Sequence, residues 1–243
     1  MEWYACYDIS ERYHDIINPS SKEKVIRAGE IAGMHAGSRV IEFGCGFAEP
    51  LALWGEHFGI SGVGVEFRPY ACDRAAARLR QAGLQDRIQI IHMNGAEYQF
   101  QPGAYDIAVC LGASFIWNGY RETIQAMRPT LVPGGRMIIG EPYWLTDQVP
   151  PEYAVREKVR SEEELLRLTR EEGYTFEYVM HSSRDEWDTY EALNWRGFCA
   201  WLRENPSHPD RPEVERTMNQ WQDDYLRFGQ KYLGWAIFVL TSV

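Results

Sequence analysis

The feature that most constrains the fold of this chain is a short apolar run that ends in a glycine-rich turn and leads directly into a helix. Arg39–Phe43 has the pattern of a buried strand, Gly44-Cys45-Gly46 follows it, and a helical pattern runs from Glu49 to Phe58. Glycines in such a turn allow the backbone to pass close to a bound ligand. The segment therefore predicts a ligand site at the carboxyl end of this strand.

Strand and helix patterns alternate through the first part of the chain. A helix capped by Ser20 or Ser21 and closed by Gly37 precedes the first strand, and further strands and helices follow it. Strands are predicted at 61–66, 87–92, 105–111 and 136–141, and helices at 69–82 and 120–131, the last stopped by Pro133-Gly134-Gly135. This alternation is typical of an α/β fold, a parallel sheet with helices on both faces.

The last hundred residues have a different pattern. Ser161 and Glu164 form a capping box for a helix that stops at Gly173, and strands are predicted at 174–182 and 234–241. We interpret residues 1–243 as a single domain. Its additions are an aromatic N-terminal segment at 1–20 and helical additions at 142–160 and 185–232. The N-terminal segment is expected either to act as a lid over the acceptor or simply to cover the sheet edge.

Composition excludes several classes of function. The chain has 25 basic and 35 acidic side chains, a net charge of −10, which argues against a nucleic-acid substrate. Its five cysteines are scattered without a CxxC pair, so no disulfide framework and no metal site are expected. No apolar run approaches the roughly 20 residues of a membrane span, and no signal peptide is visible. A cytoplasmic protein with no membrane partner is predicted.

The spacing of acidic residues around the turn narrows the ligand. Glu66 lies 22 residues after Gly44, at the end of the second strand, where a carboxylate can accept hydrogen bonds from ribose hydroxyls. Dinucleotides and S-adenosylmethionine both fit that arrangement. Glu49 occupies the position of the last small residue of GxGxxG, where its charge would repel a pyrophosphate. Glu42 suits a ligand with an ammonium group, which favours S-adenosylmethionine. An NAD(P)-dependent oxidoreductase and a non-catalytic S-adenosylmethionine-binding module are the alternatives.

Four motifs together resemble the class I S-adenosylmethionine-dependent methyltransferases. They are Val40-Ile-Glu-Phe-Gly-Cys-Gly46, Gly62-Val-Gly-Val-Glu66, Tyr105-Asp-Ile-Ala-Val-Cys110 and Leu131-Val-Pro-Gly-Gly135. Gly140-Glu-Pro-Tyr-Trp144 and later tryptophans resemble an uncharacterised bacterial branch that methylates small molecules. The resemblance implies a Rossmann-like sheet of seven strands, six parallel and the last antiparallel, with S-adenosyl-L-methionine over the carboxyl ends of the strands.

The resemblance also implies the cofactor contacts. Glu42, Gly44, Cys45 and Gly46 would lie along the methionyl part, Glu66 would bind the ribose and Phe67 would lie beside the adenine. Asn94, Gly95 and Ala96 would face the adenine edge, and Cys110 and Leu111 would offer backbone oxygen to the ammonium group. The family usually has an acidic residue where this chain has Gly95.

The predicted reaction is methyl transfer to a small-molecule acceptor by in-line displacement, with the methylated atom (O, N, S or C) left open. Glu141 ends a strand at the catalytic edge and His14 lies among aromatic residues, so both are candidate catalytic groups. By family analogy, the acceptor would contact residues of the N-terminal segment, of the loop after Leu111 and of the chain after Glu141. These are Tyr7, Tyr13, Asn18, Ser114, Trp117, Tyr143, Trp144, His181 and Trp187.

Overall fold

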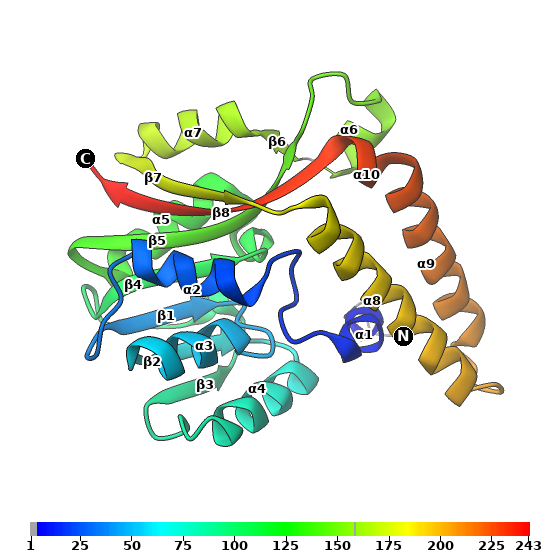
Figure 1. Ribbon diagram of the computed structural model, residues 1–243, viewed down its shortest axis with the longest axis horizontal. Helices are drawn as coiled ribbons and strands as arrows, with labels where there is room; N and C mark the ends of the chain where they lie inside the picture. Colours follow the sequence, from blue (N-terminus) through cyan, green and yellow to red (C-terminus); the bar gives the residue numbers. More distant parts are fainter. Residues whose placement is uncertain (1–3, 158) are drawn as a thin grey trace.

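A mixed sheet forms the centre of the protein in the computed structural model, which describes residues 4–157 and 159–243 (Figure 1). The strands are β1 (Arg39–Phe43), β2 (Ser61–Glu66), β3 (Ile88–His92), β4 (Tyr105–Leu111), β5 (Leu131–Trp144), β6 (Arg160–Ser161), β7 (Tyr174–His181) and β8 (Leu233–Ser242). Their order is β3-β2-β1-β4-β5-β8-β7, and the two-residue β6 pairs with the end of β5. Along that path β8 alone runs antiparallel to its neighbours, as the sequence predicts.

Helices surround the sheet. The α-helices are α1 (Ala5–Ser10), α2 (Lys22–Ile31), α3 (Glu49–Phe58), α4 (Pro69–Gln81), α5 (Tyr120–Met127), α6 (Pro151–Glu157), α7 (Glu162–Glu171), α8 (Arg184–Glu204), α9 (Arg211–Asp224) and α10 (Gln230–Tyr232). Short 3-10 turns are η1 (Glu11–Tyr13), η2 (Gly95–Glu97), η3 (Ser114–Trp117) and η4 (Arg128–Thr130), and η5 (Tyr225–Gly229) is a π-helical turn before α10. Among the described residues, no helix is both long and apolar enough to span a membrane.

Each face of the sheet buries its own apolar cluster. One cluster joins β1 and β4 to α2 and α3 around Val25 and Trp54, and the other joins β4 and β5 to α5 and α7 around Ile124 and Leu165. Residues along a strand belong alternately to one cluster and the other, because successive side chains point to opposite faces of the sheet. This packing fixes the carboxyl ends of β1, β4 and β5 in one row, where the candidate site lies.

Several predicted boundaries are wrong. The predicted 120–131 helix ends at Met127, where Pro129 stops it and η4 follows, and β5 begins at Leu131 and runs through Pro133-Gly134-Gly135. Residues 142–144 therefore belong to a strand. Helix α2, the first helix predicted from the sequence, closes at Gly33 (φ +71°) and not at Gly37.

Helices α1, α8 and α9 stand apart from the sheet in Figure 1. We call Tyr4–Ser20 the cover; Trp3, one of the aromatic residues that motivated the lid hypothesis, lies outside the described residues. Helix α1 packs on α8, where Gly197 has no side chain and comes close to the carbonyls of Ile9 and Ser10. A small apolar cluster of Ile9, Phe198, Leu202 and Val214 holds α1, α8 and α9 together.

Candidate cofactor and acceptor site

The glycine-rich turn after β1 needs both of its glycines. Gly44 and Gly46 have φ values of +68° and +53°, which residues with a side chain rarely adopt. A Cβ on Gly44 would lie 2.5 Å from that of Ala113, and one on Gly46 would clash with Ile17. The amides of Gly44 and Cys45 donate to the Val65 carbonyl at 2.8 and 3.2 Å, which ties the turn to β2. The backbone therefore passes close to both the cover and the carboxyl end of β2.

Glu66 is buried at the end of β2 and is held by backbone amides. Its Oε2 accepts from the Gly46 amide at 3.0 Å, and its Oε1 accepts from the amides of Phe67 and Arg68 at 3.0 and 2.9 Å. These bonds fix the orientation of the carboxylate relative to the glycine-rich turn. The two sequence features that predicted the ligand site therefore contact each other directly.

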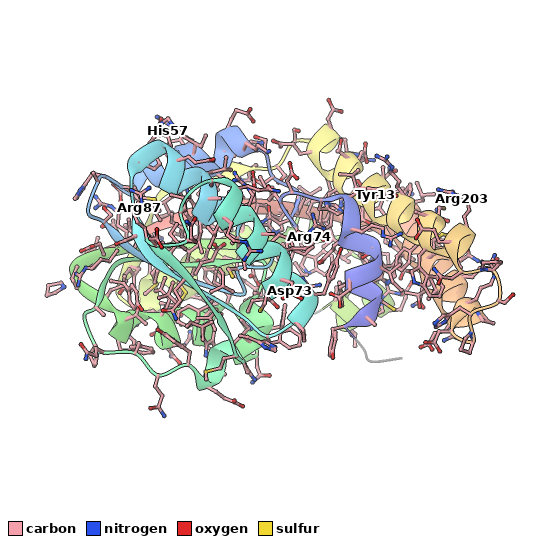
Figure 2. All side chains as sticks on the ribbon, turned by 90° about the horizontal axis from the view of Figure 1, so that it is seen from below. Tyr13, His57, Asp73, Arg74, Arg87 and Arg203 are labelled. Atoms are coloured by element: carbon pink, nitrogen blue, oxygen red, sulfur yellow. The ribbon has the colours of Figure 1, made fainter. Side chains whose placement is uncertain are left out.

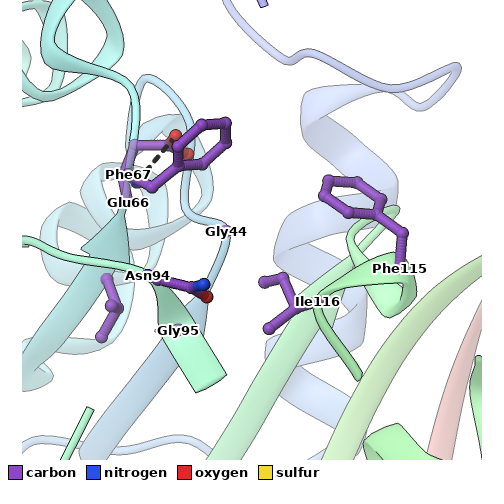
Figure 3. A pocket seen from close by; sticks show the side chains of 8 residues that line it. Gly44, Glu66, Phe67, Asn94, Gly95, Phe115 and Ile116 are labelled. Atoms are coloured by element: carbon purple, nitrogen blue, oxygen red, sulfur yellow. Dashed lines mark hydrogen bonds between the residues drawn. The ribbon is translucent and has the colours of Figure 1, made fainter. Parts of the chain in front are cut away.

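An open pocket adjoins Glu66 (Figure 3). Glu66, Phe67, Asn94 and Gly95 lie on one side of it and Phe115 and Ile116 on the other, with Gly44 and Val65 completing the lining. Asn94 caps η2 by accepting from the Ala96 amide at 3.0 Å. A Cβ on Gly95 would lie 3.3 Å from Ile116, so Ile116 takes the space that a larger residue at this position would need.

A second, enclosed pocket lies beneath the cover, and we call it the inner pocket. Glu42, Gly44, Cys45 and Leu111 line its floor, and Ile16, Ile17 and Asn18 of the cover lie over it. Cys110 contributes no side chain to it, because its thiol is buried in the α5 face of the core.

Three acidic residues line this inner pocket, Asp15, Glu42 and Glu49, and Glu42 is the most buried of them. It is 2% exposed, and its Oε2 has no hydrogen-bond partner among the described residues. Burial raises its pKa well above the usual range, and the Glu66 charge raises it further. A carboxyl group that is buried without a hydrogen-bond partner would be stabilised by a ligand that carries a positive charge or donates a hydrogen bond.

Glu141 has a similar environment near the carboxyl end of β5, although it does not end the strand as predicted, because β5 continues to Trp144. Its Oε1 accepts from the Ser114 hydroxyl at 2.9 Å, while its Oε2 is buried without a partner in the described part of the chain. Burial raises the pKa of Glu141 to about 7. The structure thus brings together Glu141 and Ser114, two residues predicted separately from the sequence.

His14 attaches the cover to α8, whereas the side-chain oxygen of Asn18 has no partner among the described residues. His14 Nε2 lies 3.0 Å from Asn194 Oδ1, and its ring packs on Tyr190 of α8 at 4.9 Å between centroids. Burial lowers the pKa of His14, which favours the neutral ring. Asn18 Oδ1 is buried without a partner among the described residues, between the inner pocket and α8.

The remaining predicted acceptor residues are spread over several surroundings. Trp117 packs edge-on against Phe43 at 5.0 Å, Trp144 packs on Tyr153 at 5.6 Å, and Tyr7 packs on Trp221 at 5.5 Å. Tyr143 and His181 pack edge-on against each other, and His181 also contacts Glu162. Tyr143 and Trp187 share a groove with Trp235 and Tyr225. Tyr13 is 40% exposed beneath Arg196, away from the sheet edge.

The sequence reasoning missed residues that the structure places at the site. Phe115 and Ile116 of η3 line the open pocket, whereas Trp117, predicted to contact the acceptor, packs against Phe43. Ile17 and Arg68 were also missed, and their partners lie far away in the sequence. The aromatic residues at 114–117 indicated that this segment belongs to the site, but they did not indicate which of its side chains line the pocket.

Comparisons with known proteins agree with this site. A model described as a methyltransferase domain matches residues 40–135. The chain is 31% identical to the uncharacterized protein YjhP of Escherichia coli (strain K12), over 100% of both sequences. A methyltransferase of Thiobacillus denitrificans in complex with S-adenosyl-L-homocysteine is 30% identical with a TM-score of 0.92 over 100% of both chains. One of Geobacter sulfurreducens, also with that ligand, is 31% identical with a TM-score of 0.91 over 98% of both chains.

The fold and the glycine-rich site define a nucleotide-binding α/β protein, and full-length similarity specifies which kind. The chain belongs to the class I S-adenosylmethionine-dependent methyltransferases, and its cofactor is S-adenosyl-L-methionine. The residues present fit that cofactor, because Glu42 places an unpartnered carboxylate in the inner pocket. This membership replaces the alternative of an NAD(P)-dependent oxidoreductase. Glu49, paired with Lys22 and Arg78 at the start of α3, puts a carboxylate where a pyrophosphate would otherwise bind.

Proposed function

We propose that the enzyme methylates a small-molecule acceptor that binds beside Glu141, and that Glu141 accepts the proton which the acceptor's nucleophile loses. The carrying observation is the unpartnered Oε2 of Glu141 at the carboxyl end of β5. Ser114 holds the other oxygen, so the orientation of the carboxyl is fixed. A base with a pKa of about 7 is well matched to proton transfer at neutral pH.

The proposed cofactor contacts follow from the two pockets. Glu42 binds the ammonium group in the inner pocket, near backbone of Gly44 and Leu111. Glu66 binds the ribose hydroxyls, and the adenine ring lies in the open pocket, with Phe67 and Asn94 on one side and Phe115 and Ile116 on the other (Figure 3). The bound cofactor supplies an electrophilic methyl group on a sulfonium, which a nucleophile displaces in line. Holding the reacting groups in that line contributes about 7–11 kcal/mol in favourable cases.

A small acceptor is favoured over a macromolecule for two reasons. The cover lies over the inner pocket and α1 packs on α8, which leaves little of the strand edge open for a large substrate. The net charge of −10 also opposes the approach of a nucleic acid. A site closed in this way excludes water from the transfer.

A labelling experiment tests the size of the acceptor. The enzyme is incubated with methyl-labelled S-adenosylmethionine and a cell extract that has been separated into protein, nucleic-acid and low-molecular-weight fractions. We expect enzyme-dependent label in the low-molecular-weight fraction. Label that accumulates only in protein or nucleic acid would refute a small-molecule acceptor.

The role of Glu141 is tested on the acceptor identified in this way. Glu141→Gln should bind S-adenosylhomocysteine within about twofold of the parent, while methylation at neutral pH falls about 10²-fold. The rise of kcat with pH through about 7 should disappear as well. Ser114→Ala is the matched control, since it keeps the carboxyl and removes its orienting bond. An unaltered pH profile in Glu141→Gln would contradict the role of a base.

A further inference from the structure

Arg68 lies between the cofactor side of the site and the cover. Its side chain is 7% exposed. Its Nη1 lies 2.8 Å from Glu11 Oε2 and 3.2 Å from Asp8 Oδ1, and its Nε lies 3.5 Å from Glu66 Oε1. One guanidinium therefore connects the carboxylate proposed to bind ribose with two carboxylates of the cover. Its own backbone amide also donates to Glu66, so Arg68 contacts that carboxylate through both main chain and side chain.

The charges in this cluster do not balance. Three carboxyls surround one guanidinium in a place with little access to water, and a buried charge without a partner is costly. Burial raises the pKa of Glu11 to about 7, even though Arg68 favours its charged form, and burial raises the pKa of Asp8 as well. Hydrogen-bond donors of a ligand at Glu66 would stabilise the negative charge of that carboxylate and weaken its attraction for Arg68. The Arg68 guanidinium would then interact more strongly with Glu11 and Asp8. The contact between the cover and Arg68 thus depends on what binds Glu66.

The cover has a second attachment that bypasses Glu66. Arg74 of α4 donates to the carbonyls of Arg12 and His14 at 3.1 and 3.0 Å, and its guanidinium lies 3.8 Å from the ring centre of Phe47. Figure 2 shows Arg74 on α4 beside the N-terminal helix. These bonds hold the backbone of the cover whatever the state of Glu66. Arg74 is therefore a matched comparison for Arg68.

We propose that Arg68 is a positioning residue that couples cofactor binding at Glu66 to closure of the cover over the inner pocket. With ribose hydroxyls on Glu66, Arg68 holds Asp8 and Glu11 more firmly, and Ile17 and Asn18 stay over the methionyl part. Without the cofactor, Arg68 is shared among three carboxylates and the cover opens more often. This inference rests on the proposed role of Glu66.

Hydrogen exchange with saturating S-adenosylhomocysteine tests the coupling. In the unmodified protein, the ligand should slow amide exchange in residues 4–20 about 10-fold, within the range usual for coupling between sites. In Arg68→Lys at saturation, this slowing should be lost. In Arg74→Lys, the cover should exchange faster without ligand, yet still slow when the ligand binds. Unchanged slowing in Arg68→Lys, or none in the unmodified protein, would overturn the proposal.

A second variant keeps the test decisive if Arg68→Lys does not fold. The double variant Asp8→Asn with Glu11→Gln removes both negative charges that hold Arg68 to the cover and leaves its contact with Glu66. It should bind S-adenosylhomocysteine, and the ligand should no longer slow exchange in the cover; retained slowing would refute the coupling. The two proposals fail separately. An affinity that does not depend on Glu66 would refute the ribose contact, whereas intact slowing in the Arg68 variant would refute only the coupling.

Discussion

The cofactor side of the site and the cover differ in how they hold their polar groups. On the cofactor side, the carboxylate of Glu66 is fixed by three backbone amides, and the glycine-rich turn is tied to β2. The cover is held mainly by long side chains from elsewhere, such as Arg68 and Arg74, and it leaves Asn18 Oδ1 without a partner among the described residues. Backbone contacts give a rigid site, whereas side-chain attachments can be released and remade. The difference indicates that the cofactor side is preformed and the cover is the part that adjusts.

The largest expected effect comes from a side chain at the glycine-rich turn. Gly46→Val should abolish measurable S-adenosylhomocysteine binding in calorimetry, because valine tolerates φ +53° poorly and its Cβ would clash with Ile17. Gly83→Ala is the control, since Gly83 also has a positive φ but faces open space. It should lower stability by about 1–2 kcal/mol and leave affinity unchanged. Normal binding by Gly46→Val would mean that the turn is only structural.

Glu66→Gln should have the next largest effect. Loss of a charged acceptor should weaken S-adenosylhomocysteine binding by about 1.5–3 kcal/mol. From the sequence alone, the position at a strand end predicts that such a variant folds normally. The structure adds that the thermal midpoint of unfolding should fall too. Both Glu66 oxygens accept from backbone amides, and in the glutamine variant the side-chain NH2 group, itself a donor, would face some of those amides. Unchanged affinity would show that Glu66 serves the turn and not the ligand.

A smaller effect is expected where the chain departs from the family pattern. Gly95→Asp should weaken S-adenosylhomocysteine binding several-fold, because its Cβ would lie 3.3 Å from Ile116 and 3.4 Å from Phe43. The double variant with Ile116→Ala should recover part of the loss, since it removes the obstructing side chain. If Gly95→Asp alone strengthens binding, Ile116 yields readily and the packing explanation is wrong.

The smallest expected effect is the dependence of folding stability on pH that two buried carboxyl groups cause. Burial raises the pKa of Glu141 and of Glu191 on α8 from 4.5 to about 7. The folded protein therefore binds more protons than the unfolded chain between about 4.5 and 7, and the free energy of unfolding falls as pH rises through that window. The thermal midpoint of the ligand-free protein should be a few degrees higher near pH 5.5 than near pH 7.5. Glu191→Gln should reduce that difference, and an opposite slope would contradict the burial of these carboxyls.

The sheet, and the position of the glycine-rich turn beside Glu66, could be predicted from the sequence because both depend on local patterns. The bounds of β1, β2, β4 and α3 are as predicted, since strand period, glycine turns and caps act over a few residues. The start of β5 was missed because Pro133-Gly134-Gly135 reads as a turn, although pairing with β4 draws Leu131 into the sheet. Local chemistry was overridden there by a tertiary contact.

The acceptor side was harder to predict for a different reason. Arg68 follows Glu66 closely, but its partner Asp8 lies 60 residues away, and nothing near either residue signals the pair. Glu141 was chosen from its predicted position at a strand end and Ser114 by family analogy from the loop after Leu111, and their hydrogen bond follows from the pairing of β4 with β5. The roles of His14 and the aromatic residues stay predictions, because their direction depends on helix packing that a single sequence does not encode.

The contact of Ile17 with Gly46 has a consequence for the order of events during turnover. The same short segment lies over the inner pocket, where we propose that the methionyl part binds, and it also lines a hollow beside α8. In this proposed arrangement, the donor is released and replaced only when that segment lifts. Each catalytic cycle then requires one opening, and its frequency sets a ceiling on the turnover number however fast the chemical step is. Slow release of S-adenosylhomocysteine would then make this product an inhibitor of further turnover.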